Sequence, residues 1–207
     1  MKEAAAQTAN LFVILLGLGL AFQVGHFFEH AFQFVVWVLG NYQWVSVNFC
    51  GRGVPYMSPP ATEMVRFLGA HLFAGDTPAR QMMVGMEILH LIGNAIFLAT
   101  IAGVFCLYPV RLVRYALYIE GAHMCEHVLL TMSAYLIGKS IGLSTLFGHA
   151  QSLWGIEAAV GWRVTFHFVM NLLPMPFVMV ALMQQWSAAG ASTDANHPGI
   201  VRTQLGV

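Results

Sequence analysis

Four long apolar stretches divide the chain, at residues 10–39, 78–108, 110–137 and 161–186. A helix needs roughly 20 mainly apolar residues to cross the hydrocarbon core of a bilayer, and each stretch is longer than that. The pattern therefore predicts an all-α integral membrane protein with four transmembrane helices in one bundle. We expect residues 1–186 to form this single domain. Residues 187–207, which are rich in Ser, Ala and Gly, are expected to form a flexible tail.

The segments between the stretches predict how the helices are connected. Thr77 and Pro78 form a helix-start signature before the second stretch. Residues 108–109 leave room only for a tight turn, so the second and third helices should be antiparallel neighbours. The first loop is long, and its residues 61–73 are expected to form a short interfacial helix. Pro174 should kink the fourth helix, because proline cannot donate the helical hydrogen bond.

Composition supports the membrane assignment. Charged residues make up 9% of the chain and hydrophobic residues 58%, whereas soluble domains contain about 25% charged residues. The net charge is zero, which excludes the basic patch of a nucleic-acid-binding protein. The lipid bilayer is thus the expected partner, in the bacterial inner (plasma) membrane. Arg111 and Arg114 flank the shortest loop, which favours termini in the cytoplasm.

The polar residues inside the apolar stretches follow a repeated order. The first and third stretches each contain the motif H-x-x-E-H, and the second and fourth each contain H-x-x-x-N. The motif residues are, in order, His26, Glu29, His30, His90, Asn94, His123, Glu126, His127, His167 and Asn171. The order predicts an internal duplication of two helices plus two, with repeats at about residues 10–108 and 110–186. Such repeats are related by a pseudo-twofold axis along the membrane normal. The two long loops continue the pattern with His71 and His149.

These residue types at this spacing indicate a metal site. Histidines at positions i and i+4 share one face of a helix, so each H-x-x-E-H motif can bind one ion. Charged residues in a membrane span cost roughly 2.5–3.5 kcal/mol each on insertion scales and mark functional sites. Metal binding worth roughly 10–16 kcal/mol, as in zinc peptides, is large enough to offset that cost. The expected metal ligands are His26, Glu29, His30, His90, His123, Glu126, His127 and His167.

We expect two metal ions near the pseudo-twofold axis, each bound by the histidine pair of one helix and a histidine of another. Glu29 and Glu126 would bridge the ions or bind them terminally, and would be the catalytic residues. Mixed carboxylate and imidazole ligation makes iron the first choice, with copper or zinc as alternatives. The ferritin-like di-iron pattern fits only in part, through Glu87 and Glu120, because the fourth stretch has no glutamate.

The expected function is that of a membrane oxidoreductase or oxygenase acting on a lipophilic substrate or quinol. One alternative is a haem b electron-transfer subunit, in which histidines of facing helices bind the haem irons. Another is a non-enzymatic metal-binding subunit of a larger membrane complex. Assembly as a homo-oligomer or within such a complex stays open.

Overall fold

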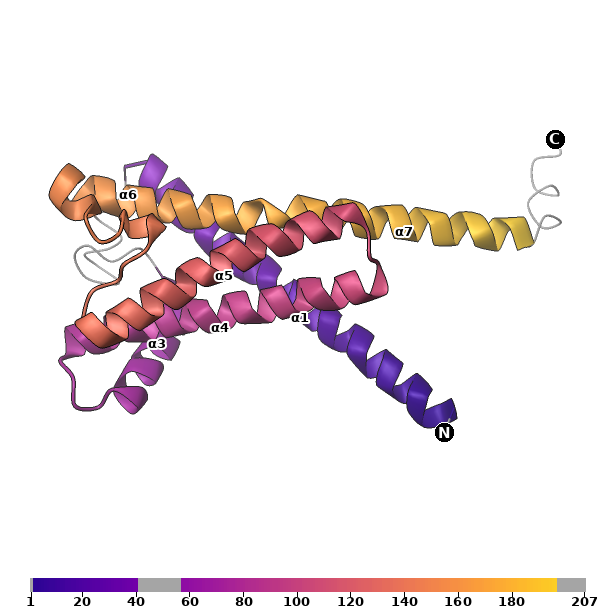
Figure 1. Ribbon diagram of the computed structural model, residues 1–207, viewed down its shortest axis with the longest axis horizontal. Helices are drawn as coiled ribbons and strands as arrows, with labels where there is room; N and C mark the ends of the chain where they lie inside the picture. The colour runs from indigo at the N-terminus through magenta and orange to yellow at the C-terminus, as the bar shows by residue number, and fades with distance from the viewer. Residues whose placement is uncertain (1, 41–56, 197–207) are drawn as a thin grey trace.

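Figure 1 shows the computed structural model of the protein, which describes residues 2–40 and 57–196. Over these residues the chain is helical, without strands. The elements are α1 (Lys2–Val38), α3 (Pro59–Leu72), α4 (Pro78–Leu107), α5 (Arg111–Ile137), the 3-10 turn η2 (Leu143–Thr145), α6 (Ala150–Leu172) and α7 (Pro174–Asn196). The all-α prediction is confirmed for this part of the chain. Cys50 of the first loop lies outside the described residues.

Three helical segments of the described chain are long and apolar enough to cross a membrane: Asn10–Val38, Pro78–Leu107 and Ala150–Ser187, the last formed by α6 and α7 together. Four such spans were predicted. The missing one is α5, whose apolar run is interrupted by two glutamates and two histidines. Leu11, Ile14 and Leu18 of α1 are all more than half exposed. Apolar side chains that face outward are what a bilayer, rather than water, accommodates.

The predicted connections are confirmed. The Thr77 side chain accepts a hydrogen bond from the Arg80 amide, and Pro78 occupies the first turn of α4. The helix expected in the first loop is α3. α4 ends at Leu107 and α5 begins at Arg111, and the two helices run antiparallel, side by side (Figure 1). The start of α1 and the end of α7 lie toward the same end of the molecule as this turn (Figure 1).

The prolines at the start of α7 divide the fourth predicted helix in two. α6 ends at Leu172 and α7 begins at Pro174, while Leu173 between them keeps helical angles. The helical path thus continues across the prolines, with α6 and α7 nearly in line (Figure 1), and the non-helical backbone angles within α6 lie at Gly155 instead. α7 continues to Asn196, past residue 186, where the flexible tail was expected to start. The last part of that tail, residues 197–207, lies outside the described residues.

Two glycines bring α3 into close contact with α4. A Cβ atom on Gly69 would meet the backbone carbonyl of Gln81, and one on Gly85 would meet that of Val65. The two helices therefore touch through their backbones, and no larger side chain fits at either position. This packing holds the start of α3 beside α1.

The interior divides into an apolar and a polar layer. The apolar core comes from α4, α5 and α7 near the turn between α4 and α5, and consists of Phe97, Ile101, Val104, Val113, Ala116, Val178 and Ala181. Farther from that turn, along α1, α4, α5 and α6, histidines, glutamates and amides are buried among the apolar residues.

Candidate metal centre

Six histidines from four helices meet in the polar layer. We call His26, His30 and His90, from α1 and α4, the first histidine group. His123, His127 and His167, from α5 and α6, form the second histidine group. All six were predicted as metal ligands from the sequence. The structure brings them together in one cluster.

Each group contains an i, i+4 pair whose ring nitrogens face each other. The Nε2 atoms of His26 and His30 lie 3.2 Å apart, and those of His123 and His127 lie 3.1 Å apart. Two imidazole nitrogens bound to one ion through bonds of about 2.0–2.1 Å at tetrahedral angles would lie about 3.3 Å apart. Both pairs therefore have the spacing of a two-nitrogen chelate.

The third histidine of each group packs against its pair. The His90 ring centroid lies 5.7 Å from that of His26 and 5.4 Å from that of His30. In the second group, the His167 ring lies 5.8 Å from His123 and 5.0 Å from His127. In the second group, one ring nitrogen of each histidine lies within 4.8 Å of those of the other two, so the three can share one ion.

The two groups touch each other. The ring centroids of His30 and His167 lie 5.8 Å apart, and those of His90 and His127 lie 5.6 Å apart. In the motifs, His30 corresponds to His127 and His90 corresponds to His167. Each contact therefore joins the second histidine of one half's H-x-x-E-H motif to the H-x-x-x-N histidine of the other half. The His90 and His167 rings are themselves 6.0 Å apart. Two ions, one in each group, would be close neighbours.

In three of the clustered histidines, Nδ1 of the ring faces a hydrogen-bond acceptor. Nδ1 of His90 lies 2.8 Å from the Met86 carbonyl, and Nδ1 of His167 lies 2.8 Å from the Arg163 carbonyl. Nδ1 of His30 lies 3.0 Å from Oε1 of Gln33. A carbonyl oxygen can only accept, so Nδ1 must hold the proton and Nε2 is left with a free lone pair. This is the tautomer that a metal ligand requires.

The two motif asparagines lie one turn beyond the third histidines. The Asn94 amide donates to the His90 carbonyl at 2.8 Å, and the Asn171 amide donates to the His167 carbonyl at 2.9 Å. Gln23 of α1 donates to Oδ1 of Asn171 at 2.8 Å. The bond from Gln23 links α1 to α6. Among the described residues, Oδ1 of Asn94 and Oε1 of Gln23 are buried without a hydrogen-bond partner.

Glu29 and Glu126 accept hydrogen bonds from the segments that follow their helices. The Glu29 carboxylate accepts from the backbone amide of Ser58 at 2.8 Å. The Glu126 carboxylate accepts from the amides of Leu143 and Ser144, both at 2.8 Å. The structure thus places both predicted metal-binding and catalytic carboxylates against backbone amides at the edge of the cluster.

Two further glutamates are completely buried nearby. Oε1 of Glu87 accepts from Arg163 and from the Ser140 hydroxyl, both at 2.6 Å. An oxygen of Glu120 lies 3.5 Å from Nδ1 of His123. Among the described residues, neither oxygen of Glu120 has a hydrogen-bond partner. An unpaired buried carboxyl is costly, and Nδ1 of His123, which also lacks a hydrogen-bond partner among the described residues, is the polar atom that faces it.

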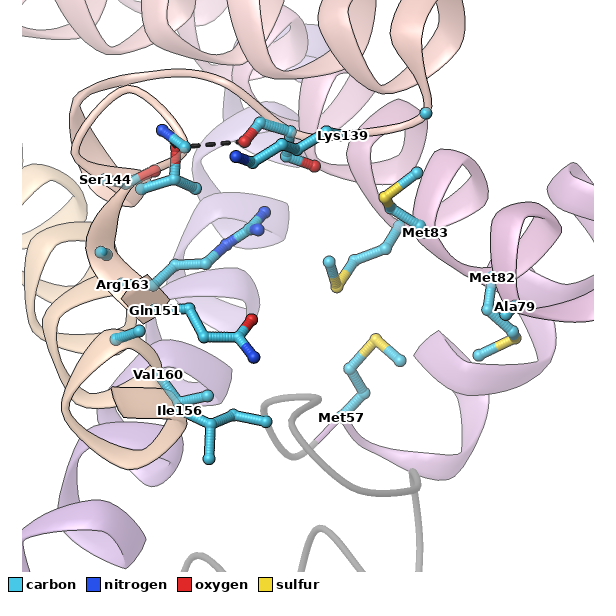
Figure 2. Close-up of a pocket in the computed structure, with 17 residues that line it drawn as sticks. Met57, Ala79, Met82, Met83, Lys139, Ser144, Gln151, Ile156, Val160 and Arg163 are labelled. Carbon is cyan, nitrogen blue, oxygen red and sulfur yellow. Dashed lines mark hydrogen bonds between the residues drawn. The ribbon is translucent and has the colours of Figure 1, made fainter. Parts of the chain in front are cut away.

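Three cavities surround the cluster. The loop cavity, of about 600 Å³, has Met57, Met82 and Met83 on one side and Gln151 and Arg163 on the other (Figure 2). A central cavity of about 20 Å³ lies where the groups meet, lined by His30, His90 and His167 among others. A side cavity of about 420 Å³ lies between α1, α3 and α4 and is lined by all three members of the first group.

Some features of the site were missed from the sequence. Glu120 was considered from the sequence only within the partial di-iron pattern and not as a partner of His123. It precedes His123 by three residues and thus shares its helix face, which is a signal for a second-sphere partner. The acceptors Met86 and Arg163 precede their histidines by four residues, as in any helix. His71 and His149, which continue the sequence repeat, are both exposed, and the His71 ring bonds to its own helix at Phe67.

Comparisons with known proteins give a family but no function. A comparison with curated proteins and one with solved structures both returned no match. The model of DUF6008, a family of unknown function, matches residues 2–199. The match spans nearly the whole chain, and the protein therefore belongs to the DUF6008 family.

Proposed function

We propose that this protein is a membrane-embedded metalloprotein in which each histidine group holds one metal ion. The main support is the Nε2–Nε2 separation of 3.2 Å in one pair and 3.1 Å in the other. Each pair has a third imidazole beside it, and in the second group the three donor nitrogens lie within 4.8 Å of one another. Among the described residues the first group does not meet this spacing, so its ion would be held mainly by the His26–His30 pair. Three protein ligands leave one position of a four-coordinate ion for another molecule.

The hydrogen bonds of the Nδ1 atoms add a second line of support. Metal-binding histidines in proteins almost always donate their other ring N–H to a carbonyl, a carboxylate or water. His30, His90 and His167 have such acceptors, and His123 has Glu120 at 3.5 Å. In the absence of an ion, the facing Nε2 atoms of each pair are at hydrogen-bond distance, and an ion would replace that hydrogen bond with two nitrogen ligands.

The internal duplication belongs to the same proposal. Equivalent contacts in the two halves have similar lengths, such as 4.6 Å for the His26–His30 rings and 4.7 Å for the His123–His127 rings. The glutamate of each half bonds to backbone amides of the following segment. These matches support a four-helix bundle of two related halves, with α5 as the fourth span, in the bacterial inner membrane.

The donor set favours copper, followed by iron. Six imidazoles converge, while Glu29 and Glu126 have other partners, so in this proposal those carboxylates position loops. Imidazole suits copper, zinc and iron, and copper forms the most stable complexes among these metals. Zinc has no redox chemistry. A redox role therefore requires copper or iron.

A haem is less well supported by the same geometry. The central cavity between the two groups has a volume of only about 20 Å³. A space of roughly 10–15 Å³ is enough for one water molecule, so the central cavity accommodates a guest of atomic size. A macrocycle between facing histidines would require the six rings to move apart.

The proposed activity is oxidoreduction of a lipophilic molecule such as a quinol. It is supported by the position of the first group, which lines a cavity among apolar helices. A metal ion with a free coordination position in that cavity would bind the substrate or an oxidant. The described helices supply the imidazoles that orient the ion and the apolar side chains that exclude water from it.

The test is the metal content of the full-length protein purified in detergent, with His71→Ala as the matched control. We expect about two copper or iron ions per wild-type chain, because each of the two histidine groups contains a two-nitrogen chelate. His26→Ala and His123→Ala should each lose about one ion, whereas exposed His71 should be dispensable. A wild-type protein without metal after loading, or equal losses in His71→Ala, would contradict the proposal.

A further inference from the structure

The two histidine groups differ in their access to ligands. His123 and His127 are 0% exposed and His167 is 4% exposed. In the first group only His30 is fully buried, while His26 and His90 are partly exposed. All three rings of the first group line the side cavity of about 420 Å³. The duplicated motifs have thus become unequal in their surroundings.

The sequence next to the motifs explains this difference. Leu89 and Gly93 flank His90 and line the side cavity. At the same positions relative to His167 the chain has Phe166 and Met170, which are both larger. The Phe166 ring lies edge-on to the His167 ring, with centroids 5.7 Å apart. Bulky side chains thus occupy the space in the second half that is a cavity in the first.

We propose that the first group is an open coordination site that accepts a neutral, ring-sized lipophilic ligand through the side cavity, and that the second group is a closed site. This rests on the proposed function, since it assigns different roles to the two bound ions. A substrate binds at an ion that keeps a free coordination position, and the side cavity makes such a position reachable from outside at the first group. The substrate would therefore meet the ion of the first group.

The lining of the side cavity indicates the chemistry of the ligand. Most of its wall is apolar and includes Ala21, Phe22, Ala61, Met64 and Leu89. Phe22 and Met64 are 45% and 48% exposed, so the apolar wall continues onto the outer surface of α1 and α3. A ligand dissolved in the lipid can reach the cavity without crossing water. A volume of several hundred Å³ is that of ordinary small-molecule pockets.

The polar groups of the side cavity lie beside the histidines. They include Glu29 and Gln33 of α1 and Ser58 before α3. A ligand with one polar end and an apolar ring would direct that end toward the ion. The loop cavity is a weaker candidate, because no histidine lines it and Lys139 and Arg163 give it cationic walls.

Gly93 allows a direct test. A Cβ atom at this position would lie 3.7 Å from the Phe22 ring and 3.9 Å from Cε1 of His26, which are ordinary contact distances. Gly93→Ala is therefore tolerated and leaves most of the cavity, whereas Gly93→Leu fills it. The probe is 4-phenylimidazole, titrated into the copper(II)-loaded full-length protein and followed by electron paramagnetic resonance. Metal content is measured for every variant.

We expect Gly93→Leu to weaken binding of 4-phenylimidazole by about tenfold or more at unchanged metal content, because the phenyl ring loses its apolar site. Gly93→Ala should stay close to wild type. His26→Ala should abolish the spectral change, and His123→Ala should keep it. Leu89→Phe, which introduces the residue type found beside His167, should act like Gly93→Leu and serves if that variant fails to fold.

Two results would overturn the inference in distinguishable ways. If the wild type binds no copper, the proposed function fails and the inference fails with it. If the wild type is metal-loaded but the titration is the same in Gly93→Leu and Leu89→Phe as in wild type, the open site is wrong and the metal centre stands. A spectral change that depends on His123 instead of His26 would also overturn it.

Discussion

The two nitrogen atoms of a clustered imidazole have separate partners. In His90 and His167, Nδ1 faces a backbone carbonyl of the same helix at 2.8 Å, while Nε2 is left for the interior. The acceptor belongs to the residue four positions earlier in the same helix, so this arrangement needs no other element. It orients both rings before any ion binds, which reduces the entropy lost on binding. In His123 and His127 of α5, by contrast, Nδ1 has no hydrogen-bond partner among the described residues.

Glu120 is the group that faces Nδ1 of His123, as the backbone carbonyls face Nδ1 of His90 and His167, but at a longer distance. Its oxygen lies 3.5 Å from Nδ1 of His123, and both residues are fully buried. We predict that Glu120→Gln, which keeps the shape and removes the charge, weakens metal binding by about 10–100-fold, as for other second-sphere partners. The measurement is competition with a chelator of known affinity.

The control for this variant is Glu63→Gln on α3. Glu63 is exposed and pairs only with Arg66 at 2.8 Å on the surface, so its loss should leave the affinity unchanged. Equal affinities in Glu120→Gln and wild type would show that Glu120 does not act on the site.

For single residues, the sequence predicted which histidines lie together, but it did not predict the hydrogen-bond partners of the carboxylates. The i, i+4 spacing determines which residues share a helix face, so His26 and His30 could be paired without a structure. Glu29 and Glu126 were expected to bind metal, yet their oxygens meet amides of Ser58 and Leu143. Those amides come from segments of irregular backbone, for which no periodicity predicts a position.

Between elements, Glu126 connects α5 to the segment before α6. Its carboxylate accepts two amide hydrogen bonds, and a Cβ atom on Gly142 would lie 2.6 Å from one of its oxygens. The backbone at Gly142 thus approaches the carboxylate so closely that a side chain has no room. This contact holds the segment over the second histidine group.

We predict that Glu126→Gln lowers the free energy of unfolding by about 1–3 kcal/mol, because the amide nitrogen of glutamine cannot accept and one buried N–H loses its partner. The metal content should stay at the wild-type level. Thermal unfolding followed by circular dichroism and elemental analysis check the two parts. Loss of an ion from the Glu126→Gln variant would instead show that the Glu126 carboxylate binds metal.

Elements with a local signal were predictable, and those that depend on their neighbours were not. The start of α4 follows from Thr77 and Pro78, and the break between α6 and α7 follows from Pro174. No comparable signal ends α7 at residue 186, and it continues to Asn196. The cavity beside the first group follows from the size of Gly93 relative to residues of α1, which only the packed structure reveals.

For the whole molecule, the open question of topology concerns α5. Its 27 residues at about 1.5 Å each give a helix of about 40 Å, longer than the hydrocarbon core of about 30 Å. It runs beside α4, which is apolar enough to span. We therefore expect the two ends of α5 to lie on opposite sides of the membrane.

The prediction is tested with single cysteines in a chain whose natural Cys50, Cys106 and Cys125 are replaced by alanine. A membrane-impermeant maleimide applied to intact cells should label only one of Arg111→Cys and Lys139→Cys. Both should be labelled after lysis. Labelling of both variants, or of neither, in intact cells would place the ends of α5 on one side and contradict the four-span bundle.

The low hydropathy of α5 has a consequence for biosynthesis. Charged residues near the centre of a span cost roughly 2.5–3.5 kcal/mol each during insertion, and α5 has both Glu120 and Glu126 there. The Thr131 hydroxyl of α5 donates to the Glu87 carbonyl of α4 at 3.2 Å, and a short turn joins the two helices. We therefore expect α4 and α5 to leave the translocon together as a helical hairpin. The ribosome would have to synthesise the chain beyond Ile137 before α4 enters the lipid.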